Sequence, residues 1–263
     1  MDLGLKGKAA AVMAGSEGIG RACAFALARE GADVAICGRR EDVLRSTAKE
    51  IADATGRRVT PIVADVTVAQ DVERFVNAAA SDLRGLHVLV VNAGGPAPGG
   101  FEALTDAQWH ATFDLTVMSA VRAIRAALPH FRTERGGSVV GIGSTSVKQP
   151  IENLVLSNAL RMSVMGLFKS LSIDHAPYNV RYNMVLPGGI ATERLAELVR
   201  SQAEKAGIPE DEQWARRAKS TPLARMGEPE EIADAVAWLA SERAKYVTGV
   251  ALQVDGGLVR FPF

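Results

Sequence analysis

The chain has 263 residues, 48% of them hydrophobic, and its 30 basic and 30 acidic residues give a formal net charge of zero. This balance offers no basic surface for nucleic acid or an anionic membrane, so neither is expected as a partner. No apolar run approaches the roughly 20 residues of a membrane span.

The first residues and the two cysteines indicate a cytoplasmic protein. The N-terminus lacks the apolar stretch of a signal peptide. Cys23 and Cys37 fall in segments expected to be buried, so no disulfide framework is expected and a reducing compartment fits. The spacing of His, Cys, Asp and Glu predicts no metal site.

Short apolar runs alternate with longer amphipathic stretches. The runs have the length of strands buried on both faces, and the stretches between them have the length of helices. Strands are predicted at 9–14, 33–37, 59–64, 87–91, 138–142, 180–186 and 251–254, and helices at 18–30, 41–54, 68–83, 106–128, 157–175 and from 228 onward.

Local signals mark two of these helices. Thr105 begins a Thr-Asp-Ala-Gln sequence that can form a capping box, and Pro129 stands where that helix is expected to stop. Pro229 takes the favoured first position of a later helix. The alternation of strands and helices predicts an α/β fold, a doubly wound parallel seven-stranded sheet with helices on both faces. No linker or repeat interrupts it, so residues 1–263 are expected to form a single domain.

The first predicted strand runs into a turn of small residues and then into a helix. Small residues let the backbone approach a pyrophosphate, while the helix N-terminus supplies free amides and a favourable dipole. Glycines also make ordinary turns, but here the strand–turn–helix context that binding requires is present. The predicted contacts are Gly15, Ser16, Glu17, Gly18 and Ile19.

Five further motifs, in order and at compatible spacing, resemble those of the short-chain dehydrogenase/reductase family. The resemblance covers nearly the whole chain and implies a Rossmann-type fold. The matching residues are Asp65 and Val66, then Asn92, Ala93 and Gly94, then Pro187, Gly188 and Thr192, followed by the segments 225–231 and 254–257.

The resemblance implies roles for these positions. Asp65 and Val66 would contact the adenine, and Thr192 would meet the nicotinamide carboxamide. Residues 192–223 would form a lid over the substrate, and members of the family commonly form tetramers, so a homotetramer or a dimer is expected. One departure is that Ala14 stands where the family's turn has glycine, which predicts weakened cofactor binding.

The cofactor's phosphate preference is set at the end of the second strand. An acid there favours NAD(H), but Gly38-Arg39-Arg40 has none, and Arg39 can pair with a 2′-phosphate. The alternative is that both arginines are solvated charges at a helix start. Glu17 argues against the phosphate interpretation, because NADP-preferring relatives often carry a basic residue there. NADP(H) is favoured over NAD(H).

The family's catalytic residues are Asn, Ser, Tyr and Lys, and only the serine is retained, as Ser144. By resemblance, Ser157 stands in the tyrosine position, Arg161 in the lysine position and Thr116 in the asparagine position. A serine hydroxyl is far less acidic than a phenol. Arg161 stays protonated, so it offers charge and hydrogen bonds to the nicotinamide ribose or to an anionic substrate but relays no protons.

Lys148 is a further candidate, in the loop that follows Ser144. If partly desolvated it can act as an acid or electrophile; the alternative is an ordinary solvated loop lysine. In the lid, Leu195, Leu198, Val199 and Trp214 either line an apolar pocket or pack in the core.

Three functions stay open at this point. The first is an NAD(P)(H)-dependent oxidoreductase that acts on a small carbonyl or hydroxyl substrate and resembles β-ketoacyl-carrier-protein reductases, with an atypical active site. The second is a cofactor-binding protein without turnover, as a sensor or as the silent subunit of a hetero-oligomer. The third is a non-redox lyase or isomerase. The first is the working hypothesis.

Overall fold

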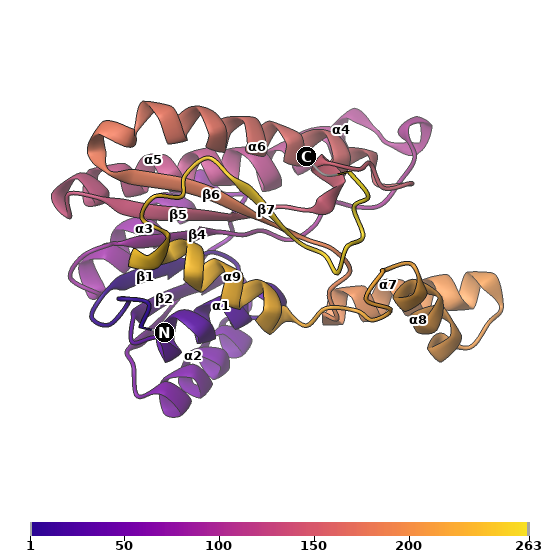
Figure 1. The fold of residues 1–263 in the computed structure, drawn as a ribbon, viewed down its shortest axis with the longest axis horizontal. Helices are drawn as coiled ribbons and strands as arrows, with labels where there is room; N and C mark the ends of the chain where they lie inside the picture. Colours follow the sequence, from indigo (N-terminus) through magenta and orange to yellow (C-terminus); the bar gives the residue numbers. More distant parts are fainter. Residues whose placement is uncertain (1, 262–263) are drawn as a thin grey trace.

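A sheet of seven parallel strands runs through the computed structural model, which describes residues 2–261 (Figure 1). The order β3-β2-β1-β4-β5-β6-β7 reverses direction between β1 and β4. In such a sheet the ligand crevice lies outside the carboxyl ends of the strands at this reversal. The strands are β1 (Ala9–Val12), β2 (Asp33–Gly38), β3 (Val59–Val63), β4 (Val88–Val91), β5 (Gly137–Ile142), β6 (Val180–Pro187) and β7 (Ala251–Val254).

Helices cover both faces of the sheet, and each face has its own apolar core. The core on one face includes α3, α5 and α6, and the core on the other includes α1, α2 and α9 (Figure 1). The predicted doubly wound α/β fold is confirmed. The helices are α1 (Gly18–Arg29), α2 (Glu41–Thr55), α3 (Ala69–Asp82), α4 (Asp106–Phe113), α5 (Ser119–Thr133), α6 (Val155–Asp174), α7 (Glu193–Ala206), α8 (Glu210–Lys219) and α9 (Pro229–Ala240).

The central strands are buried along their length. Every residue of β1 and β4 is buried, which explains their continuous apolar sequences. Cys23 and Cys37 are also buried and unbonded, and burial raises the pKa of both thiols to about 12. Both cysteines are therefore unreactive core residues.

The predicted helix at 106–128 is wrong in two respects. A π-helical segment, Asp114–Met118, interrupts it, and α5 continues through Pro129 to Thr133. An interior proline costs about 3 kcal/mol or more, while burying one large apolar side chain contributes about 1.5–3 kcal/mol. Because Ile124 and Phe131 are buried on either side of Pro129, packing outweighs the proline.

Both predicted helix starts are confirmed, but the end of the first strand is not. Thr105 forms its capping box with Gln108, and Glu228 forms one with Glu231 ahead of Pro229. The first strand ends at Val12 rather than at residue 14. The backbone turns there because Ala14 takes a left-handed conformation, with φ +46°.

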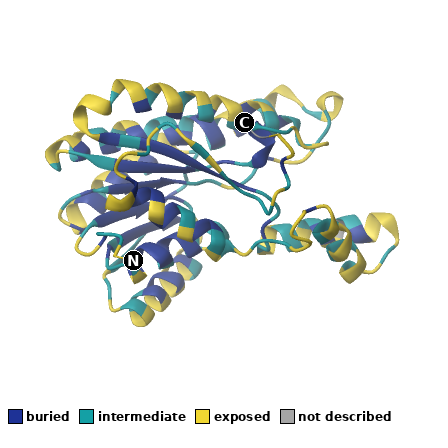
Figure 2. Ribbon diagram, in the orientation of Figure 1, coloured by how far each residue is buried: buried dark blue, intermediate teal, exposed yellow. Residues whose placement is uncertain are grey.

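The helices α7 and α8 project from the carboxyl edge of the sheet as a helical hairpin (Figure 1). Their surfaces are largely exposed or half-buried (Figure 2), and Val199 and Ala203 are the residues of this pair that reach full burial in the described part of the chain. No helix among residues 2–261 has the length and apolar character needed to cross a membrane.

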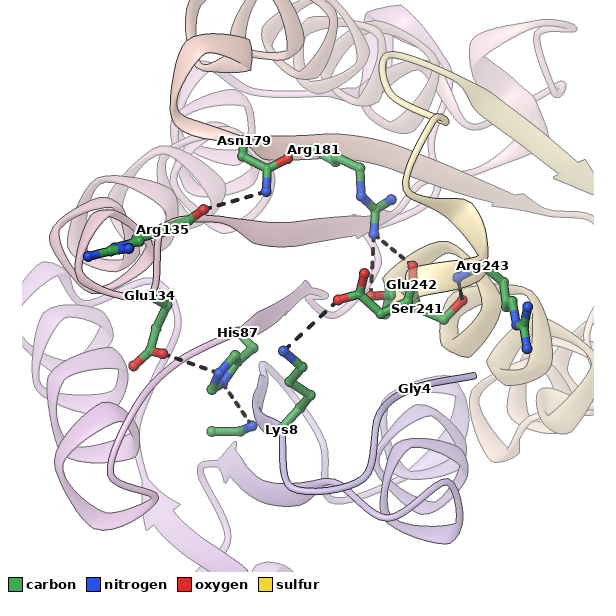
Figure 3. A network of polar contacts seen from close by, with 12 residues as sticks. Gly4, Lys8, His87, Glu134, Arg135, Asn179, Arg181, Ser241, Glu242 and Arg243 are labelled. Carbon is green, nitrogen blue, oxygen red and sulfur yellow. Dashed lines mark hydrogen bonds and ion pairs between the residues drawn. The ribbon is translucent and has the colours of Figure 1, made fainter. Parts of the chain in front are cut away.

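A polar network closes the opposite, amino-terminal edge of the sheet (Figure 3). His87 accepts a hydrogen bond from the Ala9 amide at 3.1 Å, and its other ring nitrogen lies 3.3 Å from Glu134. Arg181 donates to the carbonyls that end α9, among them that of Leu239 at 2.7 Å. The network joins the first strand, the end of α5 and the end of α9.

Candidate functional site

The turn after β1 has the geometry of a phosphate cradle. Glu17 precedes α1 without capping it through its side chain, and no acid occupies the first helical turn. The first amides of α1 are therefore available to an anion. Gly20 packs so closely that an added Cβ would lie 2.0 Å from the Ala14 carbonyl oxygen. These residues fit the pyrophosphate of a dinucleotide.

Two predicted cofactor residues meet this turn from other elements. Asn92, which follows β4, donates from Nδ2 to the Ala14 carbonyl at 3.3 Å. Thr192 precedes α7 and caps it by accepting from the Leu195 amide at 3.3 Å. An added Cβ on Gly18 would lie 3.5 Å from the Thr192 methyl group. The fold thus brings the glycine-rich turn, the end of β4 and the start of α7 together.

The charged residues that follow β2 and β3 differ in their ion pairs and hydrogen bonds. Arg40 forms an ion pair with Glu17, so the carboxylate that argued against a 2′-phosphate is compensated. Arg39 is exposed and forms no ion pair or side-chain hydrogen bond within residues 2–261. Asp65 accepts from the Thr67 amide at 2.9 Å and from its hydroxyl at 2.8 Å, holding the turn after β3.

A cavity opens between the carboxyl ends of β4 and β5, and it brings together several predicted residues. Its lining includes Asn92, Ala93 and Gly94 together with Thr116 and Arg161. Ser144, Ser157 and Lys148 are not among its lining residues. The complete lining is Val91, Asn92, Ala93, Gly94, Thr116, Ser119, Gly141, Ile142, Gly143, Arg161, Val164 and Met184.

Thr116 lies in the π-helical segment and is 9% exposed. Within the described residues its hydroxyl oxygen is one of three buried side-chain polar atoms without a hydrogen-bond partner. A buried hydroxyl without a partner costs free energy, and π-helical turns often occur at functional sites. Thr116 therefore has a hydroxyl available to a molecule in the cavity.

Arg161 reaches from α6 to the end of β5. One guanidinium nitrogen, Nη1, donates to the carbonyls of Ile142 at 3.1 Å and Gly143 at 3.0 Å. Burial and, to a lesser extent, the nearby charge of Arg194 lower the pKa of Arg161 to about 10. Arg161 thus remains a cation at neutral pH and acts through charge and hydrogen bonds.

The two predicted catalytic serines are held by local contacts. Ser144 accepts from the Ser146 amide at 3.1 Å, capping the 3-10 turn Thr145–Val147. The Ser157 hydroxyl is buried and lies 3.3 Å from the hydroxyl of Ser146. Ser157 therefore faces another hydroxyl, not the cavity.

Lys148 is neither a fully solvated loop lysine nor a lysine that lines the cavity. Its Nζ donates to Gln253 of β7 at 3.1 Å, and the residue is half-buried. It is thus anchored beside β7. The tyrosines offer no replacement acid. Tyr182 is buried, and its hydroxyl lies 2.8 Å from Nδ1 of His175, while Tyr178 and Tyr246 are exposed.

Sequence reasoning missed Arg194 at the start of α7. Its Nη2 donates to the Pro96 carbonyl at 2.9 Å, so the guanidinium lies against the segment that follows Asn92–Gly94. In the sequence it is one of many charges between 192 and 223, and its place two residues after Thr192 was the only signal. Among residues 2–261 there is no cluster of ligating side chains that could hold a metal ion.

Comparisons with known proteins agree with this geometry. A family model described as enoyl-(acyl carrier protein) reductase matches residues 13–259. The short chain dehydrogenase/reductase astE of Aspergillus oryzae is 30% identical over 256 residues, which cover 97% of this chain and 95% of that protein. Dehydrogenase/reductase SDR family member 4 of Sus scrofa is 33% identical over 254 residues, 96% of this chain and 88% of that protein.

Two solved structures have nearly the same fold. The L-sorbose reductase of Gluconobacter frateurii, solved with NADPH and L-sorbose, superposes with a TM-score of 0.96 at 31% identity and covers 99% of this chain and 100% of its own. YwfH, an NADPH dependent reductase involved in bacilysin biosynthesis, has a TM-score of 0.91 at 28% identity and covers 97% of this chain and 99% of its own.

Proposed function

The chain belongs to the short-chain dehydrogenase/reductase family, and on that premise we propose that it is an NADP(H)-dependent oxidoreductase with an atypical active site. Its substrate is a small molecule with a carbonyl or hydroxyl group. The relatives solved with NADPH support a nicotinamide cofactor. The preference for NADP(H) and the unusual catalytic residues are specific to the proposal.

The observation that carries NADP(H) is the arrangement at the end of β2. The Glu17 carboxylate is paired with Arg40, which leaves the exposed Arg39 as the uncompensated charge at this corner. A guanidinium binds phosphate through charge-assisted hydrogen bonds. We assign Arg39 to the 2′-phosphate, the amides of Gly15–Gly18 to the pyrophosphate, and Asp65 and Val66 to the adenine.

When bound, the cofactor supplies or accepts the hydride. The chain's own residues then bind and orient the reactants. Thr192 would hold the carboxamide side of the nicotinamide, and Thr116 offers its unpartnered hydroxyl to the substrate. Since the cavity has no phenol, the proton comes from water. The loss of a positioned acid typically costs about 10²–10⁴ in rate, so turnover is expected to be slow.

The first test is a titration of the protein with NADPH and with NADH, followed by fluorescence and thermal shift. We expect tighter binding of NADPH than of NADH. Arg39→Ala should raise the Kd for NADPH at least tenfold, because a hydrogen bond to a charged group contributes about 1.5–3 kcal/mol, and should change the Kd for NADH less than threefold.

Arg45→Ala is the matched control, since Arg45 is an exposed arginine of α2 paired with Glu41. It should leave both dissociation constants within twofold of wild type. Equal losses of NADPH and NADH binding in Arg39→Ala would contradict the assignment of the phosphate. A wild-type protein that binds neither nucleotide would contradict the proposed function.

A further inference from the structure

Two arginines lie near the cavity on different elements: Arg161 lines it, and the exposed Arg194 lies against Gly94 and Gly95. Arg161 comes from α6 and Arg194 from the start of α7, and each donates to backbone carbonyls, at Ile142, Gly143 and Pro96. Neither forms an ion pair with an acid in the described part of the chain. The two charges are close enough for that of Arg194 to lower the pKa of Arg161. Arg161 therefore places a positive charge in the cleft, and Arg194 adds a second one beside Gly94.

The charge of Arg161 is unmatched on the protein side. Burial is the main cause of the lowered pKa of Arg161, and no carboxylate acts against it. For Arg194, Glu197 offsets part of the effect of burial. Arg161 is half-buried, whereas Arg194 is exposed. A cation that is withdrawn from water, as Arg161 is, is ordinarily paired with an anion, because desolvating an isolated charge is expensive. The missing anion is thus expected to come from a ligand.

The phosphates proposed for the cofactor lie elsewhere. Their sites are the turn after β1 and Arg39 after β2, whereas Arg161 contacts the end of β5. In the strand order β1-β4-β5, the end of β5 is two strands from β1, a separation of about 10 Å at the usual strand spacing. Arg161 therefore lies away from the proposed phosphate sites.

A second, independent observation comes from Thr116. It lines the same cavity as Arg161, is 9% exposed and has a hydroxyl without a partner within residues 2–261. A hydroxyl can donate to an anion while the guanidinium groups bind it in a fork. Arginine suits a carboxylate at this place better than the lysine of the family pattern, since it binds both oxygens at once.

We propose that the substrate is an oxo acid or its hydroxy acid, and that Arg161 and Arg194 bind the carboxylate beside the reacting carbon, with Thr116 donating to it. The inference rests on the proposed function. In the reductive direction, the carbonyl carbon gains a hydride from NADPH, which becomes NADP⁺. The carbonyl oxygen gains a proton from water, and the carboxylate keeps its charge.

The test compares acids with their neutral methyl esters. The probes are pyruvate and 2-oxobutanoate, titrated by calorimetry with and without saturating NADPH, and then assayed for NADPH oxidation. At least one acid should bind ten times more tightly than its ester. Arg161→Met and Arg194→Met should each raise the Kd for that acid at least tenfold and that for the ester less than twofold.

Arg200→Met is the matched control, because Arg200 lies on α7 and pairs with Glu210 at the surface. It should keep the preference for the acid. Arg161→Lys is a second variant, in case Arg161→Met does not fold. It retains the positive charge but cannot bind both carboxylate oxygens through one planar group. We expect it to recover part of the lost binding, and a circular dichroism melt checks that each variant is folded.

The outcomes separate the two proposals. NADPH binding together with equal affinity for acids and esters, or with no binding of either, would overturn the inference and leave the proposed function intact. Acid binding that is unchanged in folded Arg161→Met and Arg194→Met would also overturn it. Acid binding without NADPH binding would contradict the proposed cofactor while supporting the anion site.

Discussion

Single residues decide how the cofactor turn is held. Ala14 adopts φ +46°, a region that favours glycine, and its carbonyl is held by Asn92. A non-glycine residue in this conformation costs about 1–2 kcal/mol. Ala14 therefore strains the turn that would approach the pyrophosphate, and weakened cofactor binding stays a prediction.

Ala14→Gly should tighten NADPH binding severalfold, because it removes the extra methyl group from the turn that would approach the pyrophosphate. It should also change the stability of the fold: it relieves about 1–2 kcal/mol of backbone strain, while the freer unfolded chain offsets about 0.4–1 kcal/mol. We therefore expect a net gain in unfolding free energy of about 0.5 kcal/mol. Nucleotide titration and urea unfolding measure the two effects. Ala224→Gly, at another left-handed alanine with φ +53°, is the control: it should stabilise similarly without changing the Kd. Weaker NADPH binding by Ala14→Gly would refute this account.

At the scale of elements, the packing of helix ends shapes both edges of the sheet. The π-helical segment between α4 and α5 turns Thr116 into the cavity edge. At the other edge, His87 joins the start of β4 to the end of α5 through Glu134 (Figure 3). Burial lowers the pKa of His87, and nearby Lys8 lowers it further, while Glu134 acts in the opposite direction.

This direction predicts how stability depends on pH. The folded protein binds a proton at His87 less readily than the unfolded chain. The contribution of neutral His87 is thus complete above about pH 6.5 and declines as the pH falls towards the lowered pKa. Burial also lowers the pKa of His175, so that residue adds to the same decline.

His87→Asn should reduce the loss of stability between pH 7.5 and 5, and should cost about 1 kcal/mol at pH 7.5 through the bond to the Ala9 amide. Urea unfolding at several pH values measures both. The control is His110→Asn, at an exposed position of α4, which should leave the pH profile unchanged. An unaltered profile in His87→Asn would show that other groups cause the decline.

For the whole molecule, the edge of the sheet at β7 stands out. Tyr246, Val250 and Leu252 are exposed on and just before this edge strand, and Tyr246 is fully exposed. An unpaired edge strand flanked by apolar side chains favours association with another chain. We propose that the protein forms a homotetramer or a dimer through this surface.

The double substitution Tyr246→Glu with Leu252→Glu should shift the protein to a smaller assembly, because it places repelling charges on a symmetric contact. Light scattering after size exclusion reports the mass. The control is Phe101→Glu, at an exposed aromatic residue in the 3-10 turn Phe101–Ala103. If wild type is already monomeric, or the double variant keeps its mass, the β7 surface is not the interface. A mixed assembly with a homologous chain would appear as co-purifying protein of a second mass.

Much of the fold is determined by local sequence. The apolar runs at β1 and β4, the capping boxes at Thr105 and Glu228, and the glycines after β1 each depend on neighbouring residues. These signals predicted the seven strands, apart from the end of the first, and identified the glycine-rich turn after β1. The extension of α5 past Pro129 was not predictable locally, because the burial of Phe131 against the sheet outweighs the proline.

The sequence by itself determined the fold class, the family resemblance, and the absence of tyrosine and lysine at positions 157 and 161. Only the tertiary structure decided what the replacements do. Ser157 faces Ser146, Glu17 is paired with Arg40, and Arg161 meets the end of β5. Arg194 contacts a carbonyl 98 residues away in the chain. Such contacts depend on side-chain direction and on charges from distant segments, which residue spacing does not encode.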